Sequence, residues 1–425
     1  MNQNTTLQPD VVINGAGMVG TALAVLLAQA GLQVVILEAR QESPEQLLEQ
    51  LPDALQSGFD PRVSALTLAS QAVLEQAGAW PLMQSWRVTP YIGMQVWDGL
   101  SAGKISFSAA ELHEPCLGHI VENRVTLAAL YQCALQQPGI RFCCGVQMTG
   151  LSAPDAQGGR VLTLSNQQQL YAPLLIGADG AESRTRQLAG IAATAWDYGH
   201  HAIVTTVRTE KPHGAQCWQR FTEDGPLAFL PLASGADAHL VSIVWSTSPA
   251  HAQALMAETD EAFCAALTRA ADGCLGQVLS TDPRHAINLR QRHAHQYVVP
   301  GVALAGDAAH TIHPLAGQGV NLGFLDVAAL ADVLIEAHQQ QLLLGSLDML
   351  RRYQRLRRSD NLRMSATMEL FRRLFGERPA PLRLLRSSGM NLVDRLSPVK
   401  NHLAMMAMGT RGDLPRLARR NLSVR

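Results

Sequence analysis

Glycines, an aspartate and two histidines are concentrated in residues 306–321, which read GDAAHTIHPLAGQGVN. This run follows an apolar, strand-like segment and leads into a helical pattern. Gly306 and Gly317 let the backbone approach a ligand, and a helix that begins near Gly317 directs free N–H groups and a partial positive charge at it. Asp307 can accept hydrogen bonds from sugar hydroxyls, and Pro314 stiffens the loop. The run therefore predicts a site for a cofactor that becomes anionic.

Side chains and amides of this run are candidates for direct contact with that cofactor. The expected contacts are Asp307, Pro314, Gly317, Gln318, Gly319, Val320 and Asn321. The imidazoles of His310 and His313 titrate near neutral pH and can move a proton. They can also serve only to shape the loop by hydrogen bonding. We take His313 as the candidate catalytic residue and leave both roles open.

A second glycine turn opens the chain and has the pattern of a dinucleotide site. An apolar strand at residues 11–13 is followed by Gly15, Ala16, Gly17, Met18, Val19 and Gly20, a helical run to Gly31, a second strand at residues 34–37, and Glu38. In such a βαβ unit the glycines allow the tight turn, the approach of a pyrophosphate and close helix packing, while the terminal acid binds a ribose. The pattern predicts dinucleotide binding at Gly15, Gly17, Met18, Val19, Gly20 and Glu38.

A third turn lies between these two, where the strand-like residues 174–176 precede Gly177-Ala178-Asp179-Gly180, with Ser183 and Arg186 beyond. Asp179 is its candidate for cofactor binding. The three motifs, in this order and spacing, resemble the single-component FAD-dependent aromatic hydroxylases related to p-hydroxybenzoate hydroxylase. The narrower resemblance is to the ubiquinone-biosynthesis hydroxylases, particularly the 2-polyprenylphenol hydroxylase branch. It rests on residues 60–66 (DPRVSAL), 94–98 (MQVWD), 117–123 (LGHIVEN), 196–201 (WDYGHH) and 308–324.

The resemblance implies both cofactor and reaction. FAD would be reduced by NAD(P)H or by an external reductase, would react with O2 to a C4a-hydroperoxide, and would transfer one oxygen to the ring of a polyprenylated phenol. Residues 317–319 would stabilise negative charge on the reduced flavin. The resemblance also places Arg62 near FAD, where a guanidinium can donate two parallel hydrogen bonds. Arg124, which follows Glu122 and Asn123, stands at a position that varies within the branch and is a further candidate for a flavin contact.

Two other functions remain open at this stage. The same fold can serve an FAD-dependent prenyl reductase or a halogenase, although the WxWxIP run of halogenases is absent from the sequence. A non-catalytic flavin-binding subunit is the third interpretation. Hydrolases, kinases and metalloenzymes are excluded, because the sequence has no nucleophile elbow, no phosphate-binding GKS/T loop, and no HExxH or CxxC spacing.

Length and composition agree with what the resemblance implies, a soluble flavoenzyme of mixed α/β class. The 425 residues are 47% hydrophobic and 16% charged, and no apolar run reaches the roughly 18 residues of a membrane span. The first residues lack a basic start and an apolar core, so we expect no secretory signal and a cytoplasmic location. The seven cysteines show no zinc spacing and are expected to be reduced.

Charge is distributed unevenly along the chain. Residues 351–425 hold 18 lysines and arginines against 5 aspartates and glutamates, whereas residues 1–350 hold 16 against 30. Apolar and basic residues alternate there at helical spacing, which suits an amphipathic helix on anionic lipid or on an acidic partner, or else a solvated face or a subunit contact. We expect contact with the inner-membrane surface or with a ubiquinone-biosynthesis complex, and self-association, but no nucleic acid.

The separated motifs imply a discontinuous domain. We predict a Rossmann-like FAD-binding domain from residues 1–85, 117–190 and 285–345, an interleaved β-sheet substrate domain from residues 86–116 and 191–284, and a basic helical region from 346 to 425, as in p-hydroxybenzoate hydroxylase. The substrate sheet should roof the flavin. Trp196, Tyr198, His200 and His201 could border the substrate, although aromatic side chains in a strand more often belong to the core.

Overall fold

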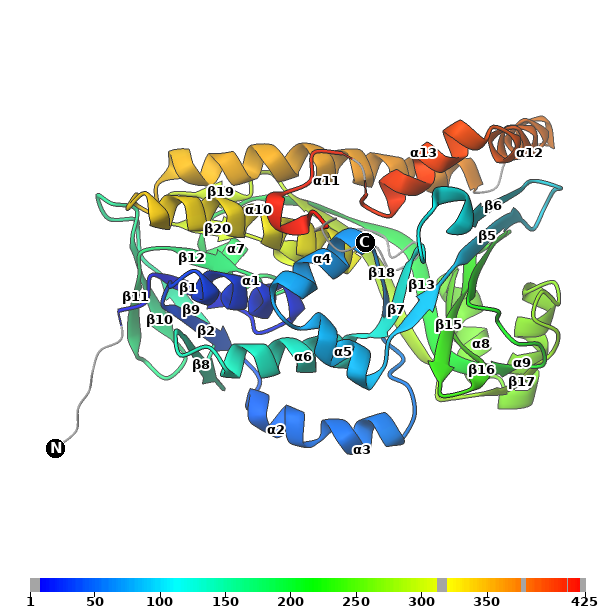
Figure 1. Cartoon of the computed structure of the whole chain (residues 1–425), viewed down its shortest axis with the longest axis horizontal. Coiled ribbons are helices and arrows are strands. Elements are labelled where there is room, and N and C mark those ends of the chain that lie inside the picture. Colours follow the sequence, from blue (N-terminus) through cyan, green and yellow to red (C-terminus); the bar gives the residue numbers. More distant parts are fainter. Residues whose placement is uncertain (1–7, 312–318, 376–379, 411, 421–425) are drawn as a thin grey trace.

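A computed structural model describes residues 8–311, 319–375, 380–410 and 412–420 (Figure 1). A mostly parallel six-stranded sheet forms one end of the molecule. Its strands, in spatial order, are β19 (Val298–Val299), β20 (Val302–Leu304), β12 (Leu175–Gly177), β1 (Val11–Asn14), β2 (Val34–Glu38) and β8 (Ile140–Cys144). All neighbours pair in parallel except β19 and β20, which are antiparallel.

Alternate residues of these strands face two different layers. Val11 and Ile13 belong to the core under the helices, whereas Val12 between them belongs to a second core on the opposite face. Continuous apolar runs form such strands because both faces of a parallel sheet are buried. The second core is covered by an antiparallel sheet of β9 (Met148–Leu151), β10 (Arg160–Leu164) and β11 (Gln169–Ala172).

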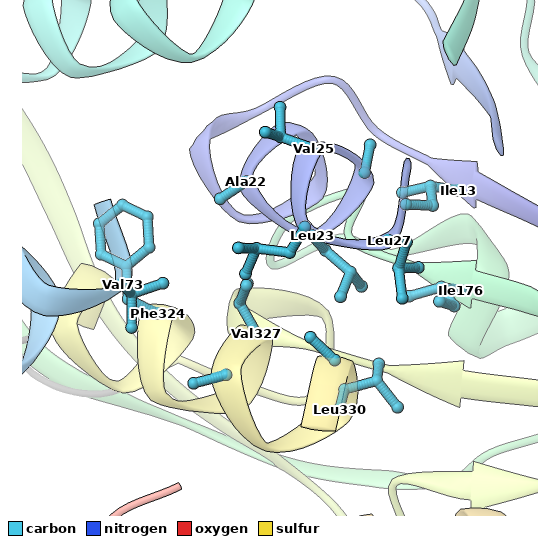
Figure 2. Close-up of a cluster of buried hydrophobic side chains, with 14 of the residues drawn as sticks. Ile13, Ala22, Leu23, Val25, Leu27, Val73, Ile176, Phe324, Val327 and Leu330 are labelled. Atoms are coloured by element: carbon cyan, nitrogen blue, oxygen red, sulfur yellow. The ribbon is translucent and has the colours of Figure 1, made fainter. Parts of the chain in front are cut away.

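The helices on the first face pack around α1 (Met18–Gln29). Against it lie α6 (Asn123–Leu135) and α10 (Gly319–Gln339), and α11 (Leu347–Phe375) covers α10. Figure 2 shows Leu23 and Leu27 of α1 directed at Val327 and Leu330 of α10. All four side chains are fully buried. Since burying one such side chain stabilises the fold by about 1.5–3 kcal/mol, this contact fixes α1 relative to α10.

A nine-stranded sheet forms the other end of the molecule (Figure 1). Its path is β21 (His310–Thr311), β18 (His285–Ala294), β13 (Ala193–Thr209), β16 (Asp237–Thr247), β15 (Gly225–Ser234), β14 (Gln216–Thr222), β5 (Gly93–Asp98) and β6 (Lys104–Ser108), with β17 (Val278–Thr281) beside β13. Helices α8 (Pro249–Ala257) and α9 (Asp260–Ala270) cover one face of it through a separate core. Because β21 follows directly after β20 and η2 (Gly306–Ala308), the chain passes from one sheet to the other at the 306–311 turn.

The other elements connect and cover these two sheets. A small antiparallel sheet contains β3 (Val63–Leu66), β7 (Gly118–Glu122) and β4 (Thr89–Tyr91). The remaining helices are α2 (Pro44–Glu49), α3 (Leu51–Gln56), α4 (Leu68–Gln76), α5 (Trp80–Trp86), α7 (Arg184–Leu188), α12 (Ala380–Arg395), α13 (Ser397–Ala407), η1 (Ala110–Leu112) and η4 (Arg416–Ala418).

The predicted fold class is confirmed: a Rossmann-like unit is combined with a large, interleaved β-sheet. The predicted strand at 34–37 is β2, which includes Glu38, and the predicted strand at 174–176 is β12, shifted by one residue. The exact domain limits stay a prediction. All seven cysteines are described and none forms a disulfide. Among the described residues, no helix is both long and apolar enough to span a membrane.

Candidate cofactor and active site

The carboxyl ends of four parallel strands bring the three sequence motifs to one edge of the six-stranded sheet. Strands β20, β12, β1 and β2 are neighbours in that order. The first glycine turn leaves β1, the 177–180 turn leaves β12, η2 follows β20, and Glu38 ends β2. Ligands of doubly wound sheets bind at this edge. Motifs far apart in the sequence therefore form one continuous site.

Gly15 and Gly20 are glycines because the backbone packs against them. Gly15 has φ of 111°, a conformation that side chains rarely adopt, and a Cβ there would collide with the Ala178 carbonyl of the neighbouring turn. A Cβ on Gly20 would collide with the Gly15 carbonyl oxygen. These two positions hold the start of α1 against the ends of β1 and β12.

Gly17 differs from its neighbours because it faces open space. A Cβ on Gly17 would meet no atom within 4 Å, and its backbone is extended. Gly17 is also the N-cap of α1, and no side chain accepts a hydrogen bond from the first-turn amides. Those amides, which include Met18, Val19 and Gly20, are the groups that bind phosphate at a helix N-terminus. The predicted pyrophosphate position is thus open and lined by amides.

Val19 connects this turn to the third motif. A Cβ on Gly306 would lie 3.1 Å from Val19, and one on Gly323 of α10 would lie 2.7 Å from it. Glycine at both positions lets the starts of α1 and α10 approach the 306–311 turn closely. Val19 is therefore part of the packing between the motifs, in addition to supplying an amide to the helix start.

Glu38 is held in place by backbone and arginine donors. Its Oε2 accepts from Ala16 N (2.9 Å), and its Oε1 accepts from Arg40 N (3.0 Å) and Nε (3.3 Å). Arg40 Nη2 also donates to the Tyr131 hydroxyl (2.8 Å), which donates to Ala16 O (2.8 Å). Burial raises the pKa of Glu38, but these hydrogen bonds outweigh burial and the pKa is lowered overall. Glu38 is thus an oriented, ionised carboxylate beside the glycine turn, as ribose binding requires.

Asp179 organises the turn after β12. It accepts from Asn14 Nδ2 (3.0 Å), Ser183 Oγ (2.5 Å), Thr185 N (2.9 Å) and Thr185 Oγ1 (3.1 Å). These donors come from β1 and from the start of α7, so the carboxylate ties two strand ends together. Its predicted contact with a cofactor stays a prediction, and its described bonds indicate that it shapes the site.

The buried Arg186 joins the second motif to the third. Its Nη1 donates to Ala308 O (2.8 Å) and its Nη2 to Ala181 O (2.9 Å). Asp307, next to Ala308, is exposed. Asp307 is therefore accessible to hydroxyl groups of a ligand.

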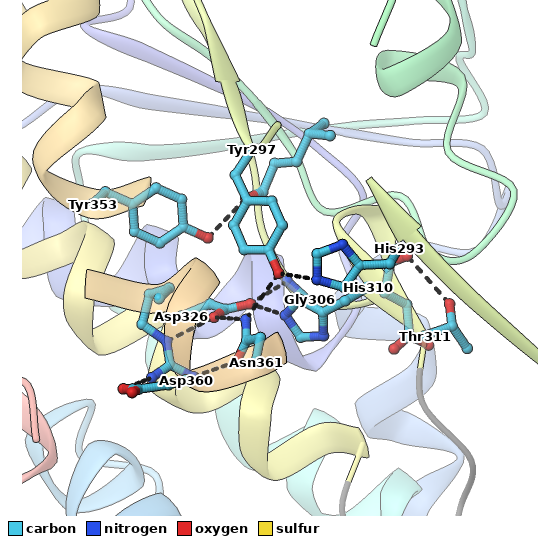
Figure 3. Close-up of polar contacts among 12 residues, drawn as sticks. His293, Tyr297, Gly306, His310, Thr311, Asp326, Tyr353, Asp360 and Asn361 are labelled. Carbon is cyan, nitrogen blue, oxygen red and sulfur yellow. Dashed lines mark hydrogen bonds and ion pairs between the residues drawn. The ribbon is translucent and has the colours of Figure 1, made fainter. Parts of the chain in front are cut away.

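A buried polar network anchors the 306–311 turn to α10 and α11 (Figure 3). Asp326 of α10 is fully buried, and its Oδ2 accepts from Gly306 N (3.1 Å) and pairs with His310 Nε2 (2.5 Å). Its Oδ1 accepts from Arg357 Nε (2.9 Å) and Asn361 Nδ2 (3.1 Å). Burial alone would raise the pKa of Asp326, but His310 and Arg357 lower it to about 2. Of the two roles left open for His310, its buried contact with Asp326 favours shaping the loop.

The network extends to the nine-stranded sheet. Asn361 Nδ2 donates to the Tyr297 hydroxyl (3.3 Å), which lies 3.1 Å from His293 Nε2 on β18. Burial lowers the pKa of His293 and raises that of Tyr297. The 306–311 turn between the two sheets is thus held in place by the Tyr297 and His293 rings on one side and by the Asp326–Arg357 ion pair on the other.

The start of α10 is set by Asn321. Its Nδ2 donates to Ala65 O (2.8 Å), and its Oδ1 accepts from Thr67 N (2.9 Å) and Ser70 Oγ (2.7 Å). Asn321 is buried, so the structure gives it contacts that position the helix. Gly319 and Val320 form the first turn of α10, and a Cβ on Gly319 would meet no atom within 4 Å. The predicted contacts at His313, Pro314, Gly317 and Gln318 lie outside the described residues.

Arg62 and Arg124 flank a buried carboxylate that sequence reasoning missed. Glu122 accepts from Arg124 Nε (2.9 Å) and from Asp60 N (2.7 Å), and it pairs with Arg87 (2.8 Å). Arg124 also donates to Gly58 O (2.6 Å). The guanidinium of Arg62 is exposed and has no ion-pair partner among the described residues. Arg62 is therefore available to a ligand, whereas Arg124 holds the 58–62 loop in place.

The structure brings most of the predicted residues together and assigns them to two adjoining turns. Gly15, Gly17, Met18, Val19, Gly20 and Glu38 surround one turn, and Asp307, Gly319 and Val320 belong to the adjoining one. We call the nine-stranded sheet the roof sheet. Of the four ring-bearing residues considered as neighbours of the substrate, Tyr198 of this sheet is buried in a cluster with Ala202 and Leu289, as the core interpretation expects. Missed residues include Asn14, Glu122 and Asp326. Each is a polar residue in an otherwise apolar stretch, which was the available signal.

These features fit FAD. The open space at Gly17 and its uncapped amides suit a pyrophosphate, Glu38 suits a ribose, and the exposed Asp307 suits the ribityl chain. The fold and this turn define a flavoprotein with a second, sheet-based layer beside the cofactor. A bound flavin supplies the redox chemistry, while the protein supplies binding, orientation and electrostatics.

Comparisons with known proteins agree with this class. The model of the FAD binding domain family matches residues 8–360. The 3-demethoxyubiquinol 3-hydroxylase of Escherichia coli is 39% identical over 95% of this chain and all of that protein. The mitochondrial ubiquinone biosynthesis monooxygenase COQ6 of Xenopus tropicalis is 36% identical over 94% of this chain and 93% of that protein. The p-nitrophenol 4-monooxygenase PnpA of Pseudomonas putida has the same fold, with a TM-score of 0.75 at 18% identity over 95% and 98% of the two chains.

The chain therefore belongs to the FAD-dependent monooxygenases of the FAD binding domain family, in the group of the ubiquinone-biosynthesis hydroxylases. It is an FAD-dependent aromatic hydroxylase, and the predicted family is confirmed.

Proposed function

We propose that this enzyme hydroxylates the aromatic ring of a polyprenylated phenol or quinol in ubiquinone biosynthesis. The observation that carries the proposal is the convergence of three motifs at one sheet edge, next to a turn that leads directly into the roof sheet. Relatives with names from this pathway match along nearly the whole chain. O2 is the oxidant, and NAD(P)H or an external reductase is the reductant.

The residues of this chain have separate tasks in the reaction. The amides at the start of α1 would hold the pyrophosphate of FAD, Glu38 would hold the adenosine ribose, and Asp307 would accept hydrogen bonds from the ribityl hydroxyls. The amides of Gly319 and Val320, at the positive end of α10, would favour negative charge on the bound group. Bound FAD supplies O2 activation. The roof sheet limits access of water to the reacting ring.

Proton transfer from the substrate hydroxyl is the remaining chemical requirement. A phenol ring becomes more electron-rich as its hydroxyl ionises, so a nearby base would speed the reaction. We propose His313 for this task, because His310 is already paired with Asp326. His313→Gln should lower turnover and remove an ionisation near neutral pH from the profile of kcat. Normal turnover with an unchanged profile would refute this role.

Two ring types are candidates for the substrate. The resemblance in the sequence favours a 2-polyprenylphenol, whereas the 39% identical relative is named as a 3-demethoxyubiquinol 3-hydroxylase. Both are electron-rich rings with a prenyl chain. The shared chemistry is ring hydroxylation, and the position of the incoming oxygen distinguishes them.

We also propose that the basic C-terminal region brings the enzyme to its lipid substrate. The excess of arginine in residues 351–425 supports contact with a membrane surface or with other enzymes of the pathway. This implies a cytoplasmic enzyme peripheral to the inner membrane, able to self-associate. Light scattering of the purified protein tests the last point, and a mass equal to one chain would contradict it.

The test of the function uses short-chain analogues of both ring types. The FAD-loaded protein is given a reductant, and O2 uptake, peroxide and product mass are followed together. A product heavier by one oxygen, with little peroxide, supports the proposal, and fragmentation gives the ring position. Peroxide alone with every analogue, or a product with a reduced prenyl bond, would refute it.

A further inference from the structure

The part of helix α12 whose side chains are described, residues 388–395, places two polar side chains against the protein. Asn391 Oδ1 accepts from Lys104 N (3.1 Å), and Asp394 Oδ1 accepts from Ser106 N (3.0 Å). Both acceptors contact β6, the edge strand of the roof sheet. Met390 is the buried apolar residue on this side, and it packs on Phe221 of the roof. The described end of α12 is therefore attached to the roof by these two hydrogen bonds and by the apolar packing of Met390.

Helix α13 continues this arrangement. Lys400 is buried and pairs with Glu111 (2.9 Å), while Asn401 Nδ2 donates to Glu111 O (3.4 Å). Ala404 and Met408 complete the buried side. Figure 1 shows α13 lying above β6 at the upper right of the molecule. An amphipathic surface helix normally directs its charged side chains outward and its apolar side chains toward the protein. Because Lys400 is buried here, the outward side of α13 has to be examined for apolar residues.

The opposite side carries a stripe of exposed apolar residues. Its members alternate at spacings of four and three residues: Leu392 (58% exposed), Leu396 (44%), Val399 (46%), Leu403 (46%) and Met406 (54%). The helices are separated by Leu396, whose backbone is not helical, but Leu396 N donates to Leu392 O (3.0 Å) and Lys400 N donates to Leu396 O (3.0 Å), so the exposed residues of α12 and α13 are joined through this turn. Contiguous exposed apolar surface of this kind marks an interaction site. We call it the α12–α13 stripe.

Charge around the stripe has one sign. Asp394 is the only acidic residue between positions 388 and 410, and its carboxylate is turned toward β6 and Lys400. Arg395 is exposed next to the stripe and has no ion-pair partner among the described residues. The wider segment from 351 to 425 carries 18 basic against 5 acidic residues. A partner must therefore be apolar at its centre and negative at its rim.

We propose that the α12–α13 stripe inserts into the interface of an anionic lipid bilayer, with both helices parallel to the membrane plane. Exposed apolar residues on one side of a helix, together with basic residues, are the pattern of interfacial helices, and Arg395 is the exposed basic residue beside this stripe. The inference rests on the proposed function to the extent that a polyprenylated substrate resides in a bilayer. Because the opposite, buried side of α12 contacts β6, insertion of the stripe brings that edge of the roof sheet close to the lipid. The enzyme then takes its substrate from the membrane on the side of the roof.

A second copy of the chain fits the stripe less well. A stable interface uses roughly 20–30 residues on each side, and the stripe offers five half-exposed side chains. Two copies would also bring like charges together, with no exposed carboxylate between residues 388 and 407 to pair with Arg395. Lipid headgroups supply the missing negative charge.

The experiment measures co-sedimentation of the full-length, FAD-loaded enzyme with phosphatidylcholine vesicles, with and without phosphatidylglycerol. We expect binding that is stronger with phosphatidylglycerol. Leu396→Ser with Leu403→Ser should weaken binding by about tenfold or more, since two partly inserted leucines are lost. Arg395→Glu should weaken binding to anionic vesicles by about fivefold or more and leave binding to neutral vesicles unchanged. The matched control is Leu279→Ser with Leu343→Ser, which removes two leucines elsewhere that are somewhat more exposed (56% and 54%) than Leu396 and Leu403.

Each outcome decides the question. If the stripe variant sediments like the unchanged enzyme, the inference is overturned. If it changes the native mass by light scattering while vesicle binding stays the same, a second copy covers the stripe and the inference is overturned. Turnover of a water-soluble short-chain phenol separates this result from the proposed function. Hydroxylation without vesicle binding refutes only the docking, and vesicle binding without hydroxylation refutes only the function.

Discussion

Replacing Gly17 by alanine should separate cofactor binding from folding. Gly17 has an ordinary extended backbone, and a Cβ there would meet no protein atom within 4 Å. A methyl group at this position therefore enters the space reserved for the pyrophosphate and nothing else. We expect the variant to fold normally and to bind FAD poorly.

The magnitudes follow from the helix start. Alanine at an N-cap costs about 0.5–1 kcal/mol relative to glycine, and the stiffer unfolded chain returns about 0.4–1 kcal/mol, so the free energy of unfolding of the apoprotein should change by less than about 1 kcal/mol. Hydrogen bonds to a charged group contribute about 1.5–3 kcal/mol each. Losing one of them, with partial loss of a second, corresponds to about 2–4 kcal/mol, or roughly 30- to 1,000-fold in the Kd for FAD.

The assay combines urea unfolding of the apoprotein with a fluorescence titration of FAD. Gly20→Ala is the first comparison: its Cβ collides with the Gly15 carbonyl, so the apoprotein itself should lose about 1–3 kcal/mol. Gly389→Ala, at an exposed position inside α12 with equally open space, should leave the Kd for FAD unchanged and raise the free energy of unfolding by about 0.5–1 kcal/mol. An affinity of Gly17→Ala within threefold of the unchanged protein would refute the reasoning, as would a loss of stability equal to that of Gly20→Ala.

Three further predictions follow from the site and the core. Glu38→Gln should weaken FAD about tenfold, as a charged acceptor becomes neutral, with unchanged kcat at saturating FAD; an unchanged Kd would contradict this. Asp326→Asn should lower the free energy of unfolding by about 3–5 kcal/mol at pH 7. Because the folded pKa of Asp326 is lowered to about 2, its stabilisation is present above pH 4 and lost as the pH falls toward 2; equal urea midpoints for the variant and the unchanged protein at pH 7 would contradict it. Burial lowers the pKa of His119 to about 4, so the unfolded chain binds its proton first, and stability should fall by about 2 kcal/mol from pH 7 to pH 5. His119→Asn should remove that part of the pH dependence, and identical pH slopes would exclude it.

The local motifs were predictable from the sequence because their signals are local. A strand, a glycine turn, a helix and a second strand must be adjacent to form a βαβ unit, and α1 and β2 fall where the pattern places them. Glycine at positions 15 and 20 could also be interpreted from the sequence, since close backbone packing at a turn requires a residue without a side chain. Even the meeting of the three motifs follows once each is placed at the carboxyl end of a parallel strand.

The contacts between distant elements were not predictable. The cofactor contact expected of Asn321 stays a prediction, but the hydrogen bonds of its side chain to Ala65, Thr67 and Ser70, which lie more than 200 residues earlier, were not foreseen. Glu122 has the same character, because its partners come from separate loops. Such pairings depend on tertiary packing, and contacts between distant residues leave no repeating pattern in a single sequence.

The C-terminal helices illustrate the same difference. Their basic, amphipathic character is visible in the sequence, but which side faces the protein is not. Lys400 looks like a surface residue and is buried against Glu111, whereas Leu403 looks like a core residue and is 46% exposed. The edge strand β6 determines which side of α12 faces the protein, because backbone N–H groups of β6 donate hydrogen bonds to Asn391 and Asp394.

The central claim is that the site described here transfers one oxygen atom from O2 to a prenylated aromatic ring. Turnover of the FAD-loaded enzyme under ¹⁸O2, with a short-chain prenylphenol and a reductant, tests it most directly. The account predicts a product that carries one ¹⁸O atom on the ring, and no label when only the water is enriched. Label from water, or labelled peroxide with unchanged substrate, would contradict it.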